Sequence, residues 1–212
     1  MKKFIVIGNP IKHSLSPLVH NYWFEQNVIK ATYDKMLVEE KELADVIENI
    51  REEKIIGANV TVPFKQKIIP LLDELSEVAQ KTNSVNTVYK KKNRIIGDNT
   101  DVFGFQNSLV ELMPNKTIQS VLLIGAGGVS PSIVQALKNV SANKVIIANR
   151  TKEKFEALKN KFGSFVQQIL WEDMHHKKLD VDLVVNSTSL GLEKKEDLNF
   201  NFSSVNKSTV FY

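Results

Sequence analysis

The sequence predicts two α/β domains built around mainly parallel β-sheets. Short apolar runs alternate with segments of helical hydrophobic period along nearly the whole chain, which is typical of βαβ units. At about 150 residues per domain, the 212 residues have room for one to two domains. A helix around residues 102–113 would bridge the two halves, so we place the boundary there, with domains at 1–103 and 104–212.

In the first domain, the expected strands are residues 4–7, 31–36 and 55–62, followed by a hairpin of 84–89 and 94–96. The expected helices are residues 17–27 and 40–51, with short helices at 65–72 and 73–80. Ser16 suits the N-cap of the first helix, because Pro17 fits its first turn. Apolar residues recur at helical spacing in the second helix. The basic segment 90–94 lies between two β-like runs and fits a solvated hairpin turn.

In the second domain, a nearly all-apolar strand at residues 117–124 runs directly into a glycine-rich turn. A helix at 129–139, a strand at 144–148 and a helix at 152–162 follow. Two further strands are expected at 183–186 and 209–212. This order favours a Rossmann-type parallel sheet.

Composition excludes several classes of function. The chain has no cysteine, which rules out disulfides, thiolate nucleophiles and zinc–cysteine sites and fits a reducing cytoplasm. A net charge of +4 without a concentrated basic face predicts no nucleic-acid partner. The apolar run at the start stops at Asn9-Pro10, and no stretch reaches membrane length, so we expect no membrane partner. His175 and His176 are adjacent and lack metal-ligand spacing, so no metal is predicted.

The turn Gly125-Ala126-Gly127-Gly128 has the context of a dinucleotide fingerprint, between a buried strand and a helix. Gly125 allows the tight turn, and Gly127 lets the backbone approach a pyrophosphate at the helix N-terminus. Ser130 stands at the third position of the fingerprint, where a small side chain still permits close packing of the helix.

The end of the next strand favours NADP over NAD. An NAD site usually has an acidic residue there for the ribose hydroxyls, but this chain has Asn149-Arg150-Thr151, with Lys154 soon after. A guanidinium and a hydroxyl suit a 2′-phosphate, and no carboxylate repels it. The alternative is an ordinary helix start, with Thr151 as N-cap and Arg150 on the surface. The glycine turn just before favours the NADP interpretation.

Polar residues gather at the expected strand ends of the first domain, where open α/β sheets bind ligands. They lie in residues 13–17, 59–65, 84–87 and 97–101. Together they offer hydroxyls, carboxamides, one ammonium and one carboxylate. This set suits a small polyhydroxylated acid.

These segments together resemble the shikimate dehydrogenase family. The matching segments, in family order, are residues 8–17 with His20 and Asn21, then 59–65, 84–87, 97–104, 125–128, 149–151 and 186–191. The resemblance implies an N-terminal substrate domain, a C-terminal Rossmann NADP domain and an active site in the cleft between them. It also implies a cytoplasmic oxidoreductase, monomer or homodimer. Its reaction would be the reversible NADPH-dependent reduction of 3-dehydroshikimate to shikimate in the chorismate pathway to aromatic amino acids.

The resemblance also implies a role for each matching residue. Lys65 would be catalytic with Asp101 as its partner, and Ser14 and Ser16 would hold the substrate carboxylate. The ring hydroxyls would be contacted by Asn59, Thr61, Asn86 and Asp101. The cofactor would be bound by Gly125, Ala126, Gly127, Gly128, Val129, Asn149, Arg150, Thr151, Lys154, Ser187, Thr188 and Leu190.

In the family, a strand like residues 208–212 is followed by a tyrosine-bearing loop and further helices, which pack on the substrate domain. The resemblance therefore predicts that the second domain is truncated here, and it gives Tyr212 no substrate role. Two alternatives remain open. The chain could be a quinate/shikimate dehydrogenase paralogue, or a non-catalytic NADP-binding module.

Overall fold

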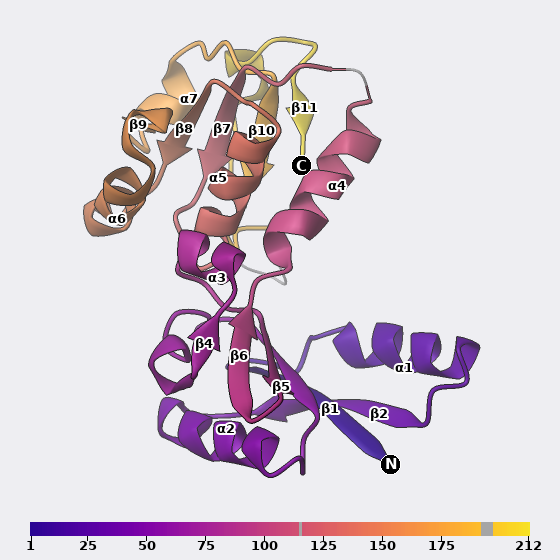
Figure 1. Ribbon diagram of the computed structural model, residues 1–212. Coiled ribbons are helices and arrows are strands. Elements are labelled where there is room, and N and C mark those ends of the chain that lie inside the picture. Colours follow the sequence, from indigo (N-terminus) through magenta and orange to yellow (C-terminus); the bar gives the residue numbers. More distant parts are fainter. Residues whose placement is uncertain (115, 192–196) are drawn as a thin grey trace. The chain divides into compact units, whose positions relative to one another are not determined.

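The computed structural model describes residues 1–114, 116–191 and 197–212 (Figure 1). The chain forms two compact units, Met1–Thr100 and Asp101–Tyr212. The boundary expected between residues 103 and 104 lies inside helix α4 (Asp101–Leu112), which belongs wholly to the second unit. This helix buries Val102, Phe105 and Leu109.

The first unit contains a six-stranded mixed sheet with the order β2-β1-β3-β5-β6-β4. Its strands are β1 (Lys2–Gly8), β2 (Ala31–Leu37), β3 (Gly57–Val60), β4 (Glu74–Leu75), β5 (Thr87–Lys91) and β6 (Arg94–Asp98). Strand β1 pairs in parallel with β2 and β3, and β4 pairs in parallel with β6. The predicted hairpin is confirmed, since β5 is antiparallel to β6 and also to β3. As a result, the amino end of β5 lies at the same edge of the sheet as the carboxyl ends of β1 and β3.

The helices of the first unit are α1 (Ser16–Gln26), α2 (Leu43–Arg51) and α3 (Glu77–Thr82), with 3₁₀ turns at Glu40–Glu42 and Ile69–Leu71. The two short helices expected at 65–72 and 73–80 are wrong in extent. Residues 69–71 form only a 3₁₀ turn, and Glu74–Leu75 pair with β6 as a strand. The later helix begins only at Glu77, and the side chain of the N-cap residue Ser76 accepts from the Ala79 N–H.

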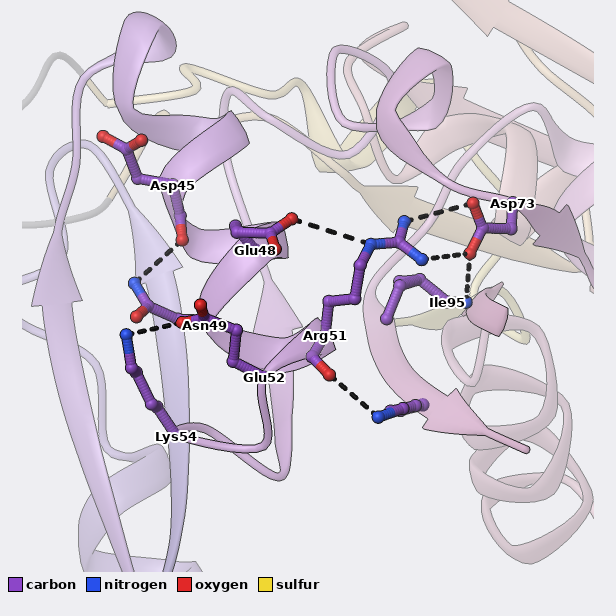
Figure 2. Close-up of polar contacts among 9 residues, drawn as sticks. Asp45, Glu48, Asn49, Arg51, Glu52, Lys54, Asp73 and Ile95 are labelled. Carbon is purple, nitrogen blue, oxygen red and sulfur yellow. Dashed lines mark hydrogen bonds and ion pairs between the residues drawn. The ribbon is translucent and has the colours of Figure 1, made fainter. Parts of the chain in front are cut away.

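Helix α2 is amphipathic as predicted and packs Leu43, Val46, Ile47 and Ile50 into the core. Figure 2 shows how its end is fixed. The Arg51 guanidinium donates to both carboxylate oxygens of Asp73, at 3.0 and 3.1 Å. The Ile95 N–H of β6 donates to the same carboxylate at 2.6 Å. These bonds, chiefly that of Arg51, hold the pKa of Asp73 below its ordinary value.

The second unit contains a five-stranded sheet with the order β11-β10-β7-β8-β9, and every pairing in it is parallel. Its strands are β7 (Ser120–Ile124), β8 (Lys144–Ala148), β9 (Val166–Ile169), β10 (Leu183–Asn186) and β11 (Val210–Phe211). Besides α4, its helices are α5 (Ser130–Asn139), α6 (Lys152–Phe162) and α7 (Asp173–His176), with 3₁₀ turns at Gly163–Phe165 and Phe202–Ser204. The predicted Rossmann-type sheet is therefore confirmed. Within the described part of the chain, no helix is long and apolar enough to cross a membrane.

Candidate active site

The polar strand ends of the first unit are held together by backbone hydrogen bonds. The Thr61 N–H donates to the Ile7 carbonyl at 2.9 Å, which fixes the segment after β3 beside the end of β1. The Val85 N–H donates to the Lys65 carbonyl at 2.8 Å. The backbone of Lys65 therefore lies against the segment that leads into β5. The structure thus gathers residues that are far apart in sequence at one edge of the sheet.

The side chain of Asn59 has a fixed orientation. Its Oδ1 accepts from the hydroxyl of Tyr33 at 2.6 Å. Its Nδ2 donates to the Asn86 carbonyl at 3.1 Å and to Thr87 Oγ1 at 3.2 Å. Since both of its N–H groups are used within the protein, the second lone pair of Oδ1 is what the side chain can offer to a ligand.

Asn86 is similarly fixed and is 8% exposed. Its Oδ1 accepts from the Thr100 N–H and from Thr87 Oγ1, both at 2.9 Å. Its Nδ2 lies 2.9 Å from Thr100 Oγ1. These bonds orient the NH₂ group and anchor the residue that directly precedes Asp101, the first residue of α4.

Tyr33 was not predicted to belong to the site, because in the sequence it is an ordinary aromatic residue of a strand. Burial raises the pKa of Tyr33 to about 12, and a hydrogen bond with the Ser16 side chain opposes this shift. Its hydroxyl is thus a donor at neutral pH. The ring of His20 stacks on it, with centroids 4.2 Å apart, and burial lowers the pKa of His20. Asn21 bonds both the Tyr33 carbonyl and its N–H, at 2.8 and 2.9 Å.

Ser14 and Ser16 lie at the start of α1. The prediction that Ser16 is the N-cap is wrong, because Leu15 occupies that position and makes no side-chain cap bond. The Ser16 N–H instead donates to Ser14 Oγ at 3.3 Å, and the Ser16 side chain turns to Tyr33. The tyrosine hydroxyl therefore links the serine segment to Asn59.

In the second unit, the glycine turn follows β7 directly. Gly125 has a φ of +102°, and a Cβ there would lie 2.8 Å from both Ser187 Oγ and Thr188 Cγ2. In contrast, a Cβ at Gly127 or Gly128 would meet nothing within 4 Å. The turn thus has open space beside it at the N-terminus of α5, where Val129 is the N-cap. Such a cradle fits a pyrophosphate, which can approach the backbone amides closely.

The segment after β8 is tied to this turn by Asn149. Its Oδ1 accepts from the Ala126 N–H at 3.1 Å, and its Nδ2 donates to the Thr151 carbonyl at 2.7 Å. Arg150, Thr151 and Lys154 are exposed next to it. Thr151 occupies the N-cap of α6 without a side-chain cap bond. Over the described residues, Arg150 makes no ion pair with a carboxylate, so the residues present fit a 2′-phosphate.

The loop after β10 packs on the glycine turn. Ser187 Oγ donates to the Ile124 carbonyl at 2.9 Å and lies 3.2 Å from the Oγ of Ser130, which is fully buried. Thr188 Oγ1 donates to Asn186 Oδ1 at 2.7 Å and accepts from the Leu190 N–H at 3.1 Å. All the predicted cofactor residues thus lie at or just beyond the carboxyl ends of β7, β8 and β10.

No cluster of three metal-ligating side chains occurs among the residues that the structure describes. His175 and His176 lie on α7, with ring centroids 6.5 Å apart.

An all-parallel sheet with an open glycine turn and a cationic neighbouring strand end defines a dinucleotide-binding unit. Together with the polar edge of the first sheet, it defines a two-domain, dinucleotide-dependent oxidoreductase. Residues 6–88 match the family model of the shikimate dehydrogenase substrate binding domain, and residues 109–195 match that of shikimate/quinate 5-dehydrogenase. The chain belongs to the shikimate dehydrogenase family.

Individual relatives agree with this family. Shikimate dehydrogenase (NADP(+)) of Pelagibacter ubique is 48% identical over 211 residues, which cover 100% of this chain and 78% of the relative. The crystal structure of shikimate dehydrogenase from Aquifex aeolicus has a TM-score of 0.88 and 37% identity, covering 100% of this chain and 77% of that one. The Thermus thermophilus enzyme in complex with NADP(H) and shikimate has a TM-score of 0.79 and 31% identity, covering 91% and 70%. The chain is accordingly an NADP-dependent oxidoreductase.

Proposed function

We propose that this chain catalyses the reversible NADPH-dependent reduction of 3-dehydroshikimate to shikimate, a step in the synthesis of aromatic amino acids. The observation that carries the proposal is the hydrogen-bonded edge of the first sheet. There Asn59 and Asn86 are oriented by Tyr33 and Thr100, and the backbones of Thr61 and Lys65 are bound to neighbouring strands. Oriented amides and hydroxyls suit a polyhydroxylated ring.

The substrate roles follow from the chemical character of each side chain. Ser14 and Ser16 bind the carboxylate through their hydroxyls. Asn86 donates from its NH₂ to a ring hydroxyl, because its Oδ1 is occupied by Thr87 and Thr100. A further hydroxyl donates to the remaining lone pair of Asn59 Oδ1. Thr61 and Asp101 complete the set of ring contacts.

In this proposal, Lys65 is the catalytic residue. NADPH, when bound, supplies the hydride that reduces the ketone carbon. The developing alkoxide then needs a proton, and the Lys65 ammonium donates one from Nζ while stabilising the negative oxygen electrostatically. Asp101 is the partner of Lys65, and its carboxylate orients the ammonium. In the reverse reaction, the neutral amine accepts the hydroxyl proton.

The cofactor residues lie in the second unit. The glycine turn and Val129 bind the pyrophosphate at the N-terminus of α5. The 2′-phosphate is bound by Asn149, Arg150, Thr151 and Lys154. This role is supported because Arg150 has no carboxylate partner among the described residues. Ser187, Thr188 and Leu190 lie toward the nicotinamide. We further infer that the protein works in the cytoplasm as a monomer or homodimer, and the absence of cysteine is compatible with a reducing compartment.

The proposal is tested by following NADPH absorbance with shikimate and NADP, with quinate and NAD in parallel. Lys65→Ala should lower kcat by about 10²- to 10⁴-fold, the range for loss of a general acid–base, with a much smaller change in shikimate affinity. Lys67→Ala is the matched control, because Lys67 pairs with Glu40 on the surface. It should retain normal turnover.

Near-normal turnover by Lys65→Ala would exclude Lys65 as the proton donor. A preference for quinate would favour the quinate/shikimate paralogue. If NADP bound to the chain but neither substrate turned over, the non-catalytic module would be the better interpretation.

A further inference from the structure

We propose that Trp171 is a positioning residue for the 2′-phosphate site and thereby contributes to the choice of NADP over NAD. Its indole ring holds the guanidinium of Arg150 at the carboxyl edge of the second sheet. This inference rests on the proposed role of Arg150 in cofactor binding.

The fold brings the two residues together from neighbouring strands. Strands β8 and β9 are parallel, and Ala148 at the end of β8 pairs with Ile169 at the end of β9. Arg150 and Trp171 each follow two residues after these positions, so both leave the sheet at the same edge. The Arg150 Cζ lies 5.4 Å from the centroid of the Trp171 ring. This distance is within the range of about 6 Å for a cation–π interaction.

The Trp171 ring is a fixed platform. It is half-buried and packs against the core cluster that contains Ile169 and Met174. The ring of His175 approaches it edge-on, with centroids 6.0 Å apart and an interplanar angle of 74°. The guanidinium of Arg150, by contrast, is on an exposed residue. A rigid ring therefore restrains a side chain that would otherwise be free to rotate.

The cation–π contact leaves the phosphate-binding atoms of Arg150 available. The contact places the guanidinium charge near the ring without giving it a carboxylate acceptor, so the guanidinium can still donate N–H groups to phosphate oxygens. Without the ring, binding of the phosphate would have to immobilise a long exposed side chain at an entropic cost. Trp171 reduces this cost, and the benefit applies only to a ligand that carries the 2′-phosphate.

The experiment compares 2′,5′-ADP with 5′-AMP, which differ only in the 2′-phosphate, by calorimetric titration of the full chain. The ratio of their affinities measures the contribution of that phosphate. Trp171→Leu should lower the ratio about three- to fivefold, the value of an exposed cation–π contact. Trp171→Phe keeps an aromatic face and should lose less. The matched control is Trp23→Leu on α1 of the first unit, which should leave the ratio unchanged.

Arg150→Ala separates this inference from the proposed function. It should remove most of the preference for 2′,5′-ADP over 5′-AMP. In the Arg150→Ala background, Trp171→Leu should then have no further effect on the ratio of the two affinities. If Arg150→Ala lowers the ratio while both Trp171 variants bind as the wild type, or bind 2′,5′-ADP more tightly, the role of Trp171 is overturned. If Arg150→Ala leaves the ratio unchanged, the result contradicts the proposed role of Arg150 in binding the 2′-phosphate, on which this inference rests.

Discussion

Two alanine substitutions in the glycine turn are expected to affect different properties, with Gly125→Ala lowering stability and Gly127→Ala lowering NADP affinity. In Gly125→Ala, the new methyl group would lie 2.8 Å from Ser187 Oγ and Thr188 Cγ2, at a φ of +102°. The backbone strain costs about 1–2 kcal/mol. Displacing Ser187 puts its 2.9 Å bond to the Ile124 carbonyl at risk, which adds about 1 kcal/mol. We expect the free energy of unfolding to fall by about 2–3 kcal/mol.

Thermal denaturation measures this loss. For a unit of this size, it corresponds to a decrease in Tm of roughly 10 °C. Gly127→Ala is the matched control, because its methyl group meets nothing within 4 Å and its φ lies outside the left-handed region. The Tm of this variant without cofactor should stay within about 2 °C of the wild type.

Binding of NADP should separate the two variants further. The methyl group of Gly127→Ala projects into the space assigned to the pyrophosphate, so calorimetry should show NADP affinity reduced by about tenfold or more. Equal losses of Tm in the two variants would refute the argument from the contacts of Gly125. Unchanged NADP affinity in Gly127→Ala would mean that the pyrophosphate does not occupy this space.

Two predictions concern pH. The pKa of Tyr33 is raised from 10.0 to about 12, so the neutral hydroxyl contributes fully to the free energy of unfolding below about pH 10, and this contribution is lost as the pH rises to 12. It is on the order of 2 kcal/mol after allowing for solvent screening. Tyr33→Phe should therefore lose less stability than the wild type over this range in urea denaturation, and a parallel loss would contradict the assignment. Because the pKa of Asp73 is lowered from 3.8, its contribution is present above about pH 4 and disappears as the pH falls. Asp73→Asn should lower the urea midpoint at pH 7, and its midpoint should converge with that of the wild type at acidic pH.

The second unit was the more predictable from sequence. Lys144–Ala148, Lys152–Phe162 and Leu183–Asn186 were predicted to the residue. Continuous apolar strands separated by turn residues determine such a parallel sheet largely by local pattern. Strand β9 was missed because its two central glutamines are exposed and interrupt the apolar run.

The first unit depends more on long-range pairing. The segment around Glu74–Leu75 was expected to be helical, but pairing with Ile96 and Gly97 makes it an edge strand. Sequence motifs could identify candidate site residues by their resemblance to a family. The partners that orient those side chains, such as Tyr33 for Asn59, come from segments that are distant in sequence and have no motif of their own.

Asn149 has a consequence for attempts to change the cofactor preference. Its side chain is a spacer between the glycine turn and the start of α6, since it bonds Ala126 on one side and Thr151 on the other. Arg150 and Lys154 are exposed residues next to it. With Arg150 and Lys154 in their proposed roles at the 2′-phosphate, we expect an exchange of charge at these two residues to change the cofactor preference, whereas replacing Asn149 would remove the bonds that tie the glycine turn to the start of α6.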